Sequence, residues 1–149
     1  MEMAWRHHRA GTREDARMIS LRVLKVEPRN ADALHLLGIL AYEANQQDEA
    51  IRLIGSAIRI YRKYAPMHGN LALAKLAKGD LAGATASARK AIALNPSYAD
   101  AHRVLGLVFQ AKGRVQEAIT EFRRARGLGL DTADLDQHFS RAQERLSGS

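Results

Sequence analysis

The chain has 149 residues, a size typical of one domain, and 46% of them are hydrophobic, enough for an apolar core. Its net charge of +7 suits acidic peptides, anionic membranes or nucleic acid, although an arginine-rich solvated surface is the plainer interpretation. The absence of cysteine excludes disulfides and thiolate metal sites. No apolar run reaches the ~20 residues that cross a bilayer, and no secretory signal is visible at the start, which favours a cytoplasmic protein.

Predicted helices follow the chain in pairs separated by short polar breaks. Thr12, with Asp15 three residues later, resembles a capping box at the start of the second helix, and Pro28 stops that helix. Asn30 and Asp80 are placed to cap two later helices. The predicted helices cover about 2–9, 12–26, 31–44, 47–61, 66–78, 81–94, 99–112 and 115–128.

One further helix is predicted after the glycines at 127 and 129, starting at Asp131 or Thr132. Its apolar residues share one face at helical spacing, and charged residues cover the opposite face. We expect it to cover the exposed end of the helices before it. The apolar residues are Leu135, Phe139, Ala142 and Leu146.

Three series of residues recur along the chain at one constant interval, the sequence separation of Gly11 and Asn45. A fixed period of this size predicts a repeat array, in which each unit buries its apolar face by stacking on the next. We expect the small residues of the second and third series to face each other where the two helices of a unit meet. The series are Gly11, Asn45, Gly79 and Gly113; Ala4, Gly38, Ala72 and Gly106; and Ala16, Ala50, Ala84 and Ala118.

The residues of the second unit resemble the tetratricopeptide repeat, a helix–turn–helix unit of about 34 residues. The resemblance rests there on Leu37-Gly38, Ala50, Ile54 and Ala57. It implies an all-α fold: a right-handed α-solenoid of antiparallel helix pairs, forming one domain over residues 1–149. The implied repeats cover about 1–30, 31–64, 65–98 and 99–132, with a capping helix over 133–146.

Nothing in the sequence indicates an enzyme. It contains no phosphate-binding loop of the GxxxxGK type, no HExxH and no nucleophile elbow. His68 and His102 are one period apart because they occupy equivalent positions of adjacent units, where the family carries tryptophan. No third ligand stands at a spacing that would complete a metal site. We therefore predict no catalytic residue, cofactor or metal.

In proteins of this family the first helix of each unit lines a concave groove, which binds extended peptides or partner helices. The corresponding rows in this chain are markedly apolar for a surface, and exposed apolar patches usually mark an interaction site. An alternative is that part of this face packs between neighbouring helices. The predicted groove residues are Trp5, Leu36, Ile39, Tyr42, Asn70, Leu73, Leu76, Arg103, Val104 and Leu107.

Two known binding modes of the family match this groove poorly. Of the carboxylate clamp that binds chaperone tails, only Asn70 is present, because His35 and Ile39 stand where lysine and asparagine are expected. Of an asparagine ladder that grips a peptide backbone, Asn70 is one rung of three.

The leading hypothesis is an adaptor that binds a peptide or partner helix, with apolar side chains, in the concave groove; its oligomeric state stays open. A first alternative is a recruiting or regulatory module of a bacterial O-GlcNAc-transferase-like or sulfotransferase system. A second is an electrostatic binder of nucleic acid or anionic membrane, which the lack of interleaved aromatic residues disfavours for single strands. Its basic stripe would comprise Arg22, Lys25, Arg52, Arg59, Arg89, Lys90, Arg123 and Arg124.

Overall fold

The computed structural model describes residues 1–148, and within them it contains nine α-helices and no strand. The limits of the helices agree with those predicted from the sequence to within one or two residues. They are α1 Glu2–Arg9, α2 Arg13–Val26, α3 Ala31–Glu43, α4 Gln47–Ile60, α5 Ala65–Lys78, α6 Leu81–Leu94, α7 Ala99–Ala111, α8 Val115–Gly127 and α9 Ala133–Ser147.

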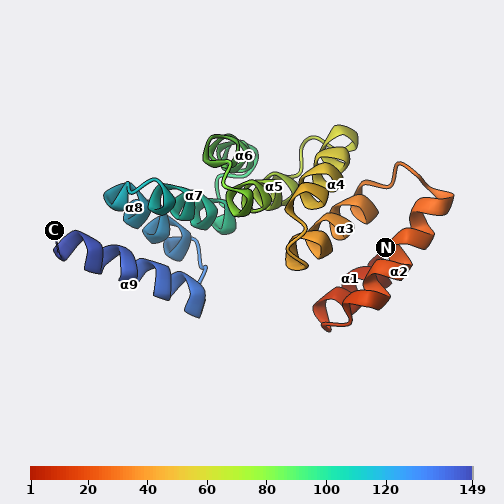
Figure 1. Cartoon of the computed structure of the whole chain (residues 1–149), viewed down its shortest axis with the longest axis horizontal. Coiled ribbons are helices and arrows are strands. Elements are labelled where there is room, and N and C mark those ends of the chain that lie inside the picture. The colour runs from red at the N-terminus through yellow and green to blue at the C-terminus, as the bar shows by residue number, and fades with distance from the viewer. Residues whose placement is uncertain (149) are drawn as a thin grey trace.

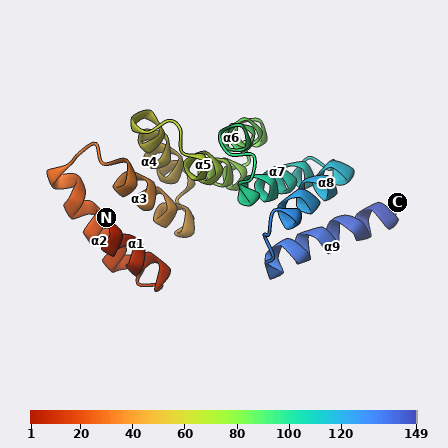
Figure 2. The same cartoon turned by 180° about the vertical axis from the view of Figure 1, so that it is seen from behind.

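Consecutive helices pack in antiparallel pairs, and the pairs follow one another along an arc with the two chain ends at opposite ends (Figure 1). Viewed from behind, the helices keep the same order (Figure 2). Odd-numbered helices also contact one another, since α3 touches α5, α5 touches α7, and α7 touches α9. The odd helices therefore line the inner side of the arc, and α4 and α6 lie on its outer side. This arrangement confirms the predicted α-solenoid.

The turn inside each helix pair explains one of the three periodic series. Gly11, Gly79 and Gly113 have positive φ angles of 78°, 87° and 73°, and Asn45 has 59°. A residue with a Cβ is strained in this left-handed region, and asparagine tolerates it best after glycine. The recurrence of glycine, or once asparagine, therefore follows from the shape of the turn.

Three of the helix starts are capped by side chains. Asn30 Oδ1 accepts from Ala33 N at 2.9 Å, as predicted, and Asp80 Oδ1 accepts from Gly83 N at 2.8 Å. Thr132 Oγ1 accepts from Leu135 N at the start of α9. The capping box at Thr12 is wrong, because the Thr12 hydroxyl donates instead to His7 O, at 3.0 Å, across the preceding turn.

Close approach of the paired helices depends on small residues, but the facing residues differ from those expected. A Cβ on Gly38 would overlap the side chain of Ile54, and one on Gly106 would overlap the ring of Phe122. The expected partners, Ala50 and Ala118, are buried one helical turn earlier. A glycine thus stands opposite each large residue. At the corresponding positions of α5 and α6 both residues are alanines, Ala72 and Ala88.

The last helix packs its apolar face on the preceding pair. Leu135 and Ala142 are fully buried in one cluster with Phe122, and Phe139 is half-buried beside them. Leu146 differs from the prediction, since 47% of it is exposed. The outward face is polar, and α9 therefore presents water with a hydrophilic surface, as a capping helix does. Its exposed residues include Asp136, Ser140 and Gln143.

None of the helices within residues 1–148 combines the length and the apolar character that crossing a membrane would require.

Candidate functional site

The inner side of the arc carries a row of apolar side chains, one from each odd-numbered helix from α1 to α7. Trp5, Ile39, Leu73 and Leu107 are spaced one repeat apart, and each is half-buried. Because they occupy equivalent positions of equivalent helices, we expect their side chains to lie on the same side of the arc. Tyr42 and Leu76, also half-buried, come from α3 and α5 one turn further along. We call these six residues the concave strip.

Two predicted groove residues are not at the surface. Leu36 is 0% exposed and Val104 is 1% exposed, so the expectation that they contact a partner is wrong. Leu36 belongs to a buried cluster with Ala4 and Ala16 of the preceding helix pair. Val104 similarly joins Ala88 of the preceding pair. Their positions on the helix place these two side chains toward the previous repeat, where they pack between adjacent repeats.

Asn70, the third residue of that row, is half-buried and bonded to a buried histidine. Its Nδ2 donates to Nε2 of His35 at 2.9 Å. Burial lowers the pKa of His35 to about 4, so the ring is neutral near pH 7 and carries its proton on Nδ1. Nδ1 has no hydrogen-bond partner within the described residues. The ring lies instead between Trp5 and Tyr64, with centroids 5.6 and 6.2 Å away.

At the N-terminal end of the concave strip a carboxylate joins the first two repeats. Glu43 accepts from Arg13 Nε at 2.6 Å and pairs with His8 Nε2 at 2.9 Å. Burial alone would raise the pKa of Glu43, but the hydrogen bonds from Arg13 and His8 outweigh burial and lower it below its ordinary value. The carboxylate is therefore ionised and its charge is already compensated.

At the C-terminal end Arg103 connects the fourth repeat with α9. Its guanidinium donates to Asp100 at 3.0 Å and to Asp134 at 3.3 Å. Beside it, His138 Nδ1 bonds Gln110 Oε1 at 2.9 Å. Polar groups at both ends of the concave strip thus have partners inside the protein, and the middle of the strip is apolar.

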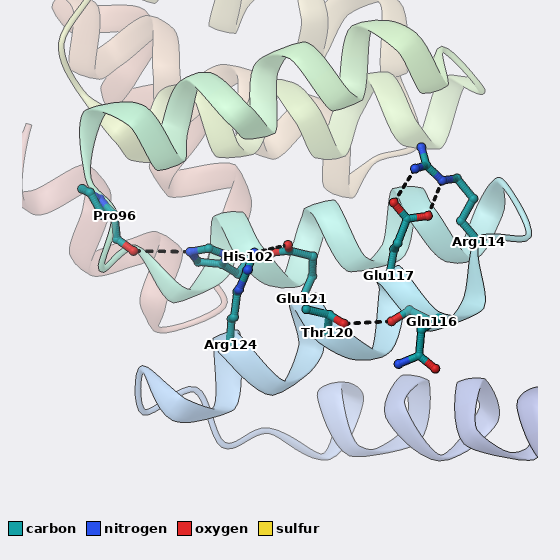
Figure 3. A network of polar contacts seen from close by, with 8 residues as sticks. All are labelled: Pro96, His102, Arg114, Gln116, Glu117, Thr120, Glu121 and Arg124. Atoms are coloured by element: carbon teal, nitrogen blue, oxygen red, sulfur yellow. Dashed lines mark hydrogen bonds and ion pairs between the residues drawn. The ribbon is translucent and has the colours of Figure 1, made fainter.

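The outer side holds a polar network that the sequence did not reveal (Figure 3). His102 Nδ1 lies 2.7 Å from Glu121 Oε2, and both side chains are over 90% buried. His102 Nε2 faces the carbonyl of Pro96 at 3.3 Å, and Arg124 donates to Glu121 Oε1 at 2.6 Å. Both neighbours of the ring are oxygen atoms that can accept hydrogen bonds from it. His68 Nε2 bonds the Arg62 carbonyl in the same way at 2.9 Å. Each of the two histidines therefore links its helix to the loop that precedes that helix.

The predicted basic stripe is exposed, but part of it is already paired. Arg52 bonds Glu49 at 2.8 Å, and Arg124 bonds Glu121. No ion pair of Arg22 or Lys25 is found in the part of the chain that the structure describes. Residues 1–148 also contain no cluster of three or more side chains suited to a metal ion.

Comparison with known proteins gives one family and several similar folds. The sequence pattern of the family described as "Tetratricopeptide repeat" matches residues 1–65 and 70–134. A crystal structure of MamA is similar with a TM-score of 0.79 and 24% identity, covering 99% of this chain and 86% of that one. The first TPR of Spaghetti (RPAP3), bound to the HSP90 peptide SRMEEVD, has a TM-score of 0.73 and 22% identity, covering 78% of this chain and 93% of that one.

The Arabidopsis OM64 TPR domain is also similar, with a TM-score of 0.73 and 22% identity, covering 77% of this chain and 95% of that one. At such identities these likenesses concern the fold. No curated protein matches the sequence significantly.

Proposed function

The chain belongs to the tetratricopeptide repeat family, and we propose that it is a non-catalytic protein-interaction scaffold that binds a peptide or partner helix along its concave strip. The observation that carries the proposal is the row of Trp5, Ile39, Leu73 and Leu107, which remain partly exposed although they are apolar. Apolar side chains gathered on one exposed face mark an interaction surface. A helix that presents apolar residues at i, i+3, i+4 and i+7 matches such a strip.

The charges favour a partner with apolar side chains over an acidic chain end. The RPAP3 structure holds a peptide ending in glutamate, valine and aspartate. In this chain the cations at the ends of the strip are already paired, since Arg103 is shared between Asp100 and Asp134 and Arg13 pairs with Glu43. Binding a carboxylate there would require breaking these ion pairs. We therefore expect peptide affinity to depend on apolar contacts and to change little with salt.

The test uses a displayed library of random peptides, selected on the unaltered protein. Selected peptides should lose affinity for the variant Tyr42→Glu with Leu76→Glu, because two central strip residues become charged. Truncating a hot-spot residue at the centre of an interface costs ~2 kcal/mol or more, so a loss of at least about thirtyfold in Kd is expected if Tyr42 or Leu76 is such a residue.

The matched control is Arg89→Glu with Lys90→Glu on α6, which changes two charges on the outer side. It should leave the affinity of the selected peptides unchanged, and circular dichroism melts should show that both variants are folded. Peptides that bind the strip variant normally, or that are lost only with the control, would overturn the proposal.

The two alternative functions stay predictions. The first alternative is that the chain serves a transferase as a recruiting or regulatory module. No feature of the structure described above identifies such a transferase as a partner. The second alternative is binding of nucleic acid or membrane through the basic stripe. This alternative is less favoured, because Arg52 and Arg124 of the stripe are already paired with glutamates.

A further inference from the structure

On the outer side, successive even-numbered helices are separated by gaps whose floor is an odd-numbered helix. The first gap lies between α2 and α4 over α3, and the third gap lies between α6 and α8 over α7. Equivalent lining positions in the two gaps are two repeats apart. The first gap is lined by Leu21, Leu24, Leu34, Leu37, Ala41 and Leu53, with Arg17 and Arg52 among the residues at its rim. At the same positions the third gap has Arg89, Ile92, His102, Leu105, Phe109 and Glu121.

The first gap is the larger and the more apolar of the two. Its hollow measures about 570 Å³, against about 290 Å³ for the third gap. A second hollow of about 550 Å³ adjoins it on α2 and shares Leu21 and Leu24 with it. Together they form an apolar trough across the outer face of α2, with room for several apolar side chains.

The outward face of α2 differs from those of the other even-numbered helices. Met18 is 42% exposed and Leu21 is 36% exposed. The residues at the Met18 position of the later repeats are Arg52, Ala86 and Thr120, and those at the Leu21 position are Gly55, Arg89 and Arg123. Within residues 1–148, only α2 carries large apolar side chains at both positions. The repeat framework does not require them, because three other helices of the same shape lack them.

Cations flank the trough. Arg22 and Lys25 lie beside Leu21 and Leu24 in the adjoining hollow, and neither forms an ion pair within the described residues. At the opposite rim Arg17 bonds Glu14, and Arg52 bonds Glu49. The unpaired charge of the trough is therefore positive.

We propose that the first gap is a second docking surface, which binds an amphipathic helix carrying acidic residues. The apolar face of that helix enters the trough over Leu21 and Leu24, and its carboxylates meet Arg22 and Lys25. The hollow shape favours a helix over a lipid bilayer, because side chains can fill a recess whereas a bilayer needs protruding apolar groups. This surface lies on the side of the arc opposite the concave strip, so it goes beyond the proposed function.

The test uses a synthetic peptide with leucines at i, i+3, i+4 and i+7 and glutamates on both flanks, measured by fluorescence anisotropy. The variant Met18→Gln with Leu21→Gln should raise its Kd at least about tenfold, because the apolar lining is lost from one wall. Both residues are exposed, so the fold should be retained. Arg22→Glu with Lys25→Glu should raise the Kd by a similar factor, through repulsion of the glutamates.

Matched controls lie two repeats away on α6. Ala86→Gln with Arg89→Gln, and Arg89→Glu with Lys90→Glu, occupy the corresponding outer face of that helix and should leave the Kd unchanged. Each measurement is repeated in the background of Tyr42→Glu with Leu76→Glu, because the concave strip also accepts apolar residues at this spacing. The weakening by the α2 variants should persist in this background, which separates this surface from the concave one.

Three results would overturn the proposal. The first is equal weakening by the α2 and α6 charge variants, which would show general electrostatic attraction. The second is unaltered binding by the α2 glutamine variant. The third is binding of phosphatidylserine–phosphatidylcholine vesicles that depends on Met18 and Leu21, with no binding of the peptide, which would assign the trough to a lipid surface.

Discussion

The first and third gaps have the same architecture but different linings. Leu34 and Leu53 of the first gap correspond to His102 and Glu121 of the third, while Leu37 and Leu105 match. The first lining leaves an apolar trough, and the other carries the buried hydrogen bond between His102 and Glu121 (Figure 3). The small residues at helix crossings therefore set the framework, whereas the residues that line the gaps can differ in chemistry from one repeat to another.

The largest effect is expected from breaking the pair in the third gap. Glu121→Leu would leave the His102 ring and the guanidinium of Arg124 without their carboxylate. Leaving a buried hydrogen-bonding group without its partner typically costs ~1–3 kcal/mol, and more where the partner is charged, and the His102 ring would be left in this state. Urea denaturation followed by circular dichroism should show this loss.

The double variant His102→Leu with Glu121→Leu gives the third gap the residues that the first gap has at the same positions. Replacing both partners by apolar residues is often neutral or stabilising. We therefore expect the double variant to recover most of the stability lost by the single one. If both variants are equally destabilised, the two gaps are not interchangeable and the comparison fails.

Two buried histidines in different halves of the chain also differ in their hydrogen-bond partners. His102 faces a carboxylate, whereas His35 has an unpaired Nδ1, and burial lowers its pKa to about 4 from the ordinary 6.5. The unfolded chain therefore takes up a proton at a higher pH than the folded chain does. Stability is complete above pH 6.5 and falls as the pH is lowered toward 4, by about 3 kcal/mol at most.

His35→Gln should remove this part of the pH dependence while keeping an acceptor for Asn70. The measurement is the free energy of unfolding at about pH 7 and about pH 4.5, for the unaltered chain and the variant. A variant whose stability falls as steeply in acid as that of the unaltered chain would show that other groups cause the decline.

A smaller effect is expected at the crossings beneath the two gaps. Gly106→Ala should destabilise by ~1–3 kcal/mol, because three atoms of the Phe122 ring lie too close to an added methyl. Gly38→Ala should cost a similar amount, because Cγ1 and the backbone N of the buried, β-branched Ile54 also lie too close to an added methyl. Gly127→Ala meets no atom within 4 Å and is the control. Thermal melts compare the three variants, and a crossing variant that melts at the same temperature as the Gly127→Ala control would contradict this prediction.

The helices could be predicted from the sequence because local signals coincide with the period. Positive-φ turn residues such as Gly79, and caps such as Asn30 and Asp80, mark the ends of helices without reference to tertiary contacts. Periodicity could not decide which residues of α3 face the groove, because that helix is apolar on several sides. Leu36 therefore looked like a surface residue, although it packs against the preceding repeat.

The contacts between side chains of different helices were harder to predict from the sequence. His102 and Glu121 lie on different helices, and no motif links them. The apolar trough, in contrast, could have been predicted from the sequence. Aligning the repeats by their common period places Leu21 beside Gly55, Arg89 and Arg123, and this contrast marks α2 as different.

The main contacts between helices within residues 1–148 link helices of one repeat or of adjacent repeats. Such a chain closes only short loops as it folds, so its contact order is low and folding should be fast. Each repeat is also stabilised mainly by its immediate neighbours, so the array can open from one end while the other stays folded. Loss of the first helix pair would then remove one wall of the apolar trough but leave the His102–Glu121 pair intact. Amide hydrogen exchange should accordingly show protection that varies along the arc rather than one value for the whole chain.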